Sequence, residues 1–168
     1  MKDRKNFTLY TTRGAIIAAL YFVLTELATM AGLSSWIIQF RISEALCILP
    51  IFMPEAIPGL FIGCLISNLF VPGVAIWDII FGSIATLVGA YGAWLLRNLP
   101  EKQKWVATLP TILANMIIVP LVLIYAYGVP DTYLFLVVTV GIGEIVCAGF
   151  GGSGLYYLMK KHEKQWLK

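Results

Sequence analysis

The chain has 168 residues, of which 60% are hydrophobic and only 12% are charged, and its mean hydropathy is +0.85. A typical soluble domain carries about 25% charged residues. This composition therefore excludes a soluble domain and indicates an integral membrane protein. The length suits a single domain covering residues 1–168. The formal net charge is +3, and the positions of the charges are more informative than their sum.

The first predicted span covers about residues 11–31, which is long enough to cross roughly 30 Å of hydrocarbon. The basic residues before it resemble the start of a signal peptide. No small-residue cleavage site follows a short apolar stretch, so we expect this segment to be retained. Within it, Ala15 and Ala19 are four residues apart on one helical face, a spacing that lets another helix approach closely. A short polar break containing Trp36 and Gln39 follows.

Five more apolar segments follow, and each is predicted to be a helix. They cover about residues 42–53, 55–70, 77–96, 105–127 and 133–159. The short segment 42–53 contains Pro50, which removes a helical hydrogen bond. Two segments carry small residues at spacings of three or four, which favours close helix packing; these residues are Gly59, Gly63, Ser67, Gly82, Thr86, Gly89 and Ala93.

The distribution of Lys and Arg separates a five-span fold from a six-span fold. With six spans, the basic residues before residue 14, between 97 and 104, and after 159 all lie on one side, and only Arg41 lies on the other. Cytoplasmic segments are enriched in Lys and Arg. The sequence therefore predicts an all-α bundle of six transmembrane helices with both termini in the cytoplasm.

Several polar residues lie inside or at the mouths of these apolar segments. They are Glu26, Arg41, Glu44, Asn68, Asp78, Asn115 and Glu144. Polar groups are costly when they face lipid, so we expect them to face the bundle interior or a cavity, where they suit a small polar ligand. Arg41 and Glu44 are three residues apart, so a helix would let them pair. Structural alternatives stay open: an interfacial ion pair for Arg41 and Glu44, an N-cap-like role for Asp78 and an interhelical hydrogen bond for Asn115.

Other functional classes lack their sequence signals. The chain has no GxxxxGK[ST], HExxH or GxSxG motif, so a nucleotide-binding loop, a zinc protease and a serine hydrolase are disfavoured. Its three cysteines lie in apolar segments without a nearby His, which is typical of small buried hydrophobic residues rather than of a metal site or disulfide. We expect no metal, no cofactor and no nucleic-acid partner.

Three stretches resemble the QueT family of substrate-binding (S) components of energy-coupling factor (ECF) transporters. They are RISEAL at residues 41–46, AIPGLFIGCL at 56–65 with Asn68 after it, and DIIFGSIATL at 78–87. A weaker match, GIGE, ends at Glu144, and the similarity runs over nearly the whole chain. The resemblance implies an S-component-like bundle in the bacterial cell membrane that takes up queuosine precursors. These are 7-deazaguanines such as 7-aminomethyl- or 7-cyano-7-deazaguanine.

The resemblance also implies partner proteins, namely a transmembrane coupling component and two cytoplasmic ATPases. We expect Ala15 and Ala19 to contact the coupling component. The predicted ligand residues are Glu144, Asp78, Asn68, Asn115, Glu44, Arg41, Trp36 and Gln39. Among them, Glu144 and Asp78 are expected to be the main ligand carboxylates, with Arg41 and Glu44 holding the first outer loop over the site. The alternatives are an S component for another small molecule, a self-sufficient proton-coupled carrier and, with least support, a membrane enzyme.

Overall fold

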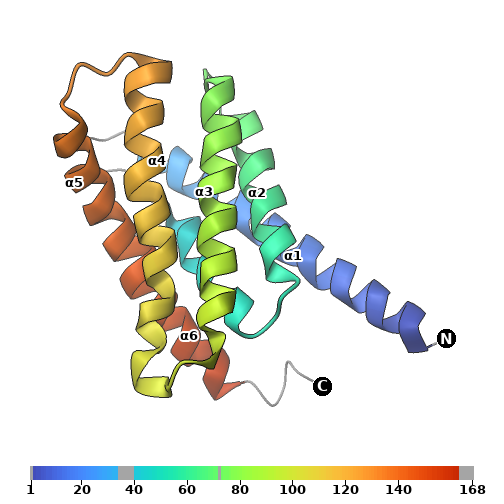
Figure 1. The fold of residues 1–168 in the computed structure, drawn as a ribbon. Helices are drawn as coiled ribbons and strands as arrows, with labels where there is room; N and C mark the ends of the chain where they lie inside the picture. Colours follow the sequence, from blue (N-terminus) through green and yellow to red (C-terminus); the bar gives the residue numbers. More distant parts are fainter. Residues whose placement is uncertain (1, 34–39, 72, 163–168) are drawn as a thin grey trace.

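The fold is a bundle of helices, and no strand occurs in the part of the chain that the structure describes (Figure 1). The structure is a computed structural model that describes residues 2–33, 40–71 and 73–162, with side chains from residue 7 onward. In Figure 1, α1 (Lys2–Met30) extends away from the bundle toward the N-terminus. The all-helical class predicted from the sequence is confirmed for these residues.

The elements follow one another with short connections. After α1 they are η1 (Ile42–Ile51), α2 (Ala56–Phe70), α3 (Ile76–Leu95), η2 (Leu96–Asn98), η3 (Glu101–Thr108), α4 (Leu109–Tyr127), α5 (Tyr133–Glu144), η4 (Ile145–Gly151) and α6 (Gly152–Lys161). η1, η2 and η3 are 3₁₀ helices, and η4 is a π-helix. Gly128, directly after α4, has a left-handed backbone (φ 63°) and caps the C-terminal end of the helix.

Four helical stretches in the described residues are long and apolar enough to cross a membrane. They are Phe7–Met30, Ile76–Asn98, Glu101–Tyr127 and Tyr133–Lys161. η1 and α2 are also apolar but shorter. At about 1.5 Å per residue, the 15 residues of α2 extend roughly 22 Å, less than the hydrocarbon thickness. A membrane protein is therefore supported, while the six-span count and the cytoplasmic termini stay predictions.

Some helix boundaries differ from those expected. α1 begins at Lys2 rather than near residue 11, because the intervening residues include no proline or glycine that would break the helix. The segment 42–53 is a 3₁₀ helix containing Pro50. Residues 97–104, which separate two of the predicted apolar segments, lie mostly in the 3₁₀ helices η2 and η3. The last segment is not one regular helix, since η4 separates α5 from α6.

The small-residue faces predicted from the sequence pack against neighbouring helices. A Cβ on Gly59 would lie 2.6 Å from the carbonyl oxygen of Gly14, so α1 and α2 meet backbone to backbone there. A Cβ on Gly63 would lie 2.9 Å from the carbonyl oxygen of Ala18. A Cβ on Gly89 of α3 would clash with Thr111 of α4. These contacts fix the helices around the polar groups described next.

Candidate functional site

A cavity of about 340 Å³ opens where the start of α3 meets the end of α4. This volume is at the lower end of the range for small-molecule sites, roughly 300–1,000 Å³. The cavity walls come from α1, η1, the end of α2, the start of α3 and the end of α4. Its lining residues are Tyr21, Thr25, Ala28, Arg41, Ser43, Asn68, Val71, Gly73, Val74, Asp78, Leu123, Tyr127 and Val129.

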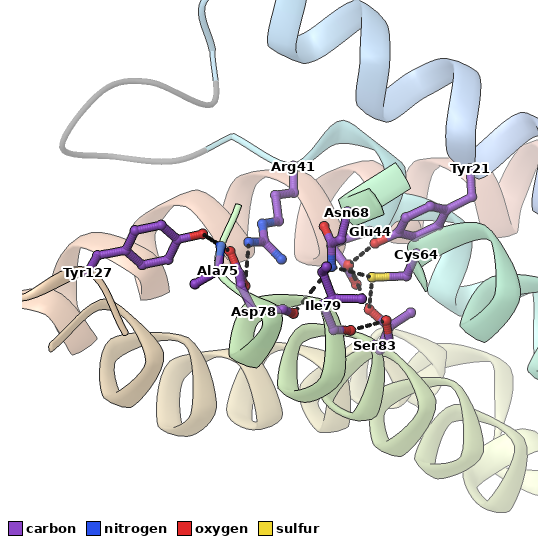
Figure 2. Close-up of polar contacts among 11 residues, drawn as sticks. Tyr21, Arg41, Glu44, Cys64, Asn68, Ala75, Asp78, Ile79, Ser83 and Tyr127 are labelled. Carbon is purple, nitrogen blue, oxygen red and sulfur yellow. Dashed lines mark hydrogen bonds and ion pairs between the residues drawn. The ribbon is translucent and has the colours of Figure 1, made fainter. Parts of the chain in front are cut away.

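Asp78 is the carboxylate in the cavity wall. Its Oδ1 lies 3.8 Å from Nη2 of Arg41, and its Oδ2 accepts a hydrogen bond of 3.0 Å from the Tyr127 hydroxyl (Figure 2). Tyr127 in turn accepts a hydrogen bond from the backbone N–H of Ala75, one residue before α3. The Asp78 Oδ1 atom is buried and has no hydrogen-bond donor among the described residues. Asp78 therefore keeps unused hydrogen-bonding capacity beside the cavity.

Asn68 and Gly82 lie beside Asp78. The Asn68 Nδ2 atom is 3.4 Å from the backbone oxygen of Asp78. A Cβ on Gly82 would lie 3.1 Å from Asn68 Nδ2 and 3.3 Å from Asp78 Oδ1, so glycine leaves space beside these polar atoms. Asp78 is in the first turn of α3, where its carboxylate lies at the positive end of the helix dipole, so the N-cap-like structural role stays open beside a ligand role.

Glu44 lies outside the cavity lining and is fully buried. Its Oε1 accepts hydrogen bonds from the Tyr21 hydroxyl and from Thr86 Oγ1, and its Oε2 accepts one from Cys47 Sγ (Figure 2 shows the first of these). The predicted pairing of Arg41 with Glu44 is wrong, because the ion pair of Arg41 is with Asp78. Arg41 precedes η1 with non-helical backbone angles, so its side chain does not follow the expected helical face.

Glu144 and Asn115 are buried in the core, with 3% and 0% of their surfaces exposed. Neither residue lines the cavity. Both atoms of the Asn115 amide and the Oε2 atom of Glu144 lack hydrogen-bond partners in the described part of the chain. The structure thus brings Asp78, Arg41 and Asn68 together at the cavity and places Glu44, Glu144 and Asn115 outside its lining. A direct ligand contact for these last three stays a prediction.

The remaining predicted residues lie elsewhere. Trp36 and Gln39 lie outside the described residues. Ala15 and Ala19 are exposed on α1 and line an apolar groove of about 560 Å³ between α1 and α2. No group of three or more His, Cys, Asp or Glu side chains that could hold a metal occurs among the described residues.

The sequence analysis missed two tyrosines that shape the site, Tyr21 and Tyr127. Tyr127 could have been found from its position, because it is the last residue of the predicted segment 105–127. Antiparallel packing of two consecutive long helices brings the end of α4 near the start of α3, where Asp78 lies. Tyr21 had no such signal, since a tyrosine inside an apolar helix is typical of core packing.

Comparison with known proteins then fixes the family. The sequence profile of the family described as QueT transporter matches residues 11–161. The chain belongs to the QueT transporter family. A queuosine precursor transporter QueT from Lactococcus lactis subsp. cremoris (strain MG1363) is 36% identical over 107 residues, which are 62% of this chain and 60% of that relative. No solved structure matches. The QueT family is a family of transporters, which argues against the enzyme alternative.

Proposed function

We propose that this chain is a substrate-binding membrane subunit of an ECF-type importer and captures a queuosine precursor in the cavity at Asp78. The name of the Lactococcus relative supports the class of cargo, although the alignment covers 60% of that protein. The observation that supports the site is that Asp78 lines the cavity and that its buried Oδ1 atom has no hydrogen-bond donor among the described residues. A buried acceptor without a donor suits a ligand that supplies one.

The chemistry of the cavity fits a 7-deazaguanine. Such a base carries a ring N–H donor and an amino donor side by side, and a carboxylate can accept hydrogen bonds from both. Asn68 can donate and accept at the base edge, and the Arg41 guanidinium offers donors to a carbonyl oxygen. The cavity volume of about 340 Å³ accommodates a small bicyclic base.

The proposal predicts that Asp78→Asn weakens ligand binding by about one to two decades, because a charge-assisted hydrogen bond is worth roughly 1.5–3 kcal/mol. Calorimetry with 7-aminomethyl- and 7-cyano-7-deazaguanine on the purified chain measures this change. The matched control is Asp131→Asn, since Asp131 is exposed in the loop after α4 and outside the cavity lining. Unchanged affinity in a folded Asp78→Asn protein would sink the assignment.

Identification of the cargo needs an experiment that assumes no candidate. Small molecules extracted from the purified protein and identified by mass spectrometry would reveal what it carries. Recovery of a deazaguanine supports the proposal, and recovery of an unrelated compound favours an S component for a different molecule.

We further propose that energy comes from two cytoplasmic ATPases through a transmembrane coupling component that docks on α1. The exposed Ala15 and Ala19 beside the α1–α2 groove support this arrangement, because small residues let a partner helix come close. Ala19→Trp should prevent co-purification with the coupling component while ligand binding survives. Leu20→Trp is the control, since Leu20 is exposed on α1 but outside the groove. Uptake by the chain alone would instead support the proton-coupled carrier.

A further inference from the structure

The wall of the cavity at Asp78 contains one positive and one negative side chain. Among the described residues that line it, Arg41 and Asp78 are the two that are charged at neutral pH, and the rest are apolar or uncharged. Residues 34–39 (SSWIIQ) and Pro72 lie outside the described ranges, and none of them is an Asp, Glu, Lys or Arg. The charges of the cavity wall therefore cancel.

The two charges lie close enough to compensate each other. Arg41 Nη2 is 3.8 Å from Asp78 Oδ1, and the two side chains are 18% and 14% exposed. This distance is an ion-pair contact and is too long for a hydrogen bond, so the pair balances charge without using up the acceptors of Asp78. Hydrogen bonds from an uncharged ligand leave this balance intact. A ligand with an ammonium group would add a net positive charge to a mostly buried site, which is costly unless a carboxylate pairs with it.

The other acids in the apolar segments do not supply that carboxylate to the cavity wall. Glu26, Glu44 and Glu144 are all outside its lining. Glu44 is fully buried, and both of its oxygens already accept hydrogen bonds from other side chains. Asp131, in the loop after α4, is exposed, so water and salt screen its charge. A ligand ammonium group in the cavity would thus share its one carboxylate with Arg41.

We propose that the cavity selects uncharged deazaguanines over those that carry an ammonium group. The inference rests on the proposed function and narrows its substrate class. The 7-cyano base is uncharged, whereas the amine of the 7-aminomethyl base, like that of lysine, is protonated at neutral pH. Arg41 determines this specificity, because its guanidinium cancels the charge of Asp78.

Calorimetry on the purified chain with three ligands tests the proposal. They are the 7-cyano base, the 7-aminomethyl base and 7-hydroxymethyl-7-deazaguanine, which is uncharged and has nearly the shape of the aminomethyl base. We expect both uncharged bases to bind about tenfold or more tighter than the aminomethyl base.

Each other result overturns the proposal in a way that can be told apart. Equal or tighter binding of the aminomethyl base overturns it and leaves the proposed function intact. A hydroxymethyl base that binds as weakly as the aminomethyl base overturns it by assigning the difference to shape. If none of the three ligands binds, the proposed function fails and this inference fails with it.

Two variants test the role of the ion pair. Arg41→Gln removes the cation but keeps a polar side chain, so the ratio of affinities should shift by about tenfold or more toward the aminomethyl base. Asp78→Asn leaves Arg41 unbalanced and should shift the ratio the other way. The matched control is Arg13→Gln, which removes the guanidinium of the ion pair with Glu55 outside the cavity lining and should keep the native ratio. A native ratio in whichever of the two cavity variants folds overturns the proposal.

Discussion

Tyr21 connects the core to the cavity through a single hydroxyl group. It lies on α1, lines the cavity and donates a hydrogen bond to the buried Glu44. Glu44 also accepts a hydrogen bond from Thr86 of α3, so the carboxylate joins η1 to both α1 and α3. The cluster of Tyr21, Glu44 and Thr86 thus positions the segment that carries Arg41 at the cavity.

Removal of the Tyr21 hydroxyl should destabilise the chain. Tyr21→Phe keeps the ring packing but removes a hydrogen bond to a buried carboxylate, which costs about 1.5–3 kcal/mol. We expect a lower midpoint of thermal unfolding in detergent. Tyr125→Phe is the control, because Tyr125 is 85% exposed and should tolerate the same change. Equal midpoints for the two variants would contradict a structural role for the Tyr21 hydroxyl.

At the scale of elements, α1 and α2 form a close helix pair in which glycine lets the two backbones meet. Gly59 of α2 meets the backbone of Gly14, and Arg13 of α1 forms an ion pair of 3.2 Å with Glu55 at the start of α2. The backbone contact and the ion pair hold one face of α1 against α2. The neighbouring face, with Ala15 and Ala19, is exposed and lines the groove between α1 and α2.

Gly59→Ala should weaken this contact. The added methyl group would lie 2.6 Å from a backbone oxygen that cannot move without shifting α1. Overpacking of this kind typically costs about 1–3 kcal/mol. Gly154→Ala is the matched control, because a Cβ there meets no atom within 4 Å. Denaturant or thermal unfolding of both variants measures the difference, and a Gly59→Ala chain as stable as Gly154→Ala would show that the two helices can separate freely.

At the scale of the whole molecule, the distribution of basic residues along the bundle predicts which end faces the cytoplasm. The cavity opens at the end that contains Asp78 and Tyr127, and the basic residues of η3 and α6 lie at the other end (Figure 1). The positive-inside rule places that basic end in the cytoplasm. The cavity would then open to the outside, as an importer requires.

Cysteine labelling in intact cells tests this orientation. A cysteine at Ser34 or Asp131 should react with a membrane-impermeant maleimide, and a cysteine at Glu101 should not. The three native cysteines are buried, so their background reaction should be low. Labelling at Glu101 with protection of the other two positions would reverse the topology and exclude capture from outside.

The sequence by itself determined the class of the protein. Hydropathy, the positions of charges and the spacing of small residues are local properties, so they identified the apolar helices and the small-residue packing faces of α2 and α3. The family resemblance came from the three matching stretches at residues 41–46, 56–65 and 78–87. They also identified Asp78, Asn68 and Arg41, because ionisable and amide side chains inside apolar segments are costly unless they have a partner or a ligand.

Only the tertiary structure decided how those polar residues pair. Helical spacing predicted an ion pair between Arg41 and Glu44. In the 3₁₀ helix η1 and the helices packed around it, Arg41 instead forms an ion pair with Asp78. Glu44 accepts hydrogen bonds from Tyr21 and Thr86. Spacing along one helix cannot predict these partners, because they lie 23 to 42 residues apart in the chain for Glu44. The same packing buries Glu144 and Asn115 in the core, outside the cavity lining, whereas sequence alone had grouped both with the ligand residues.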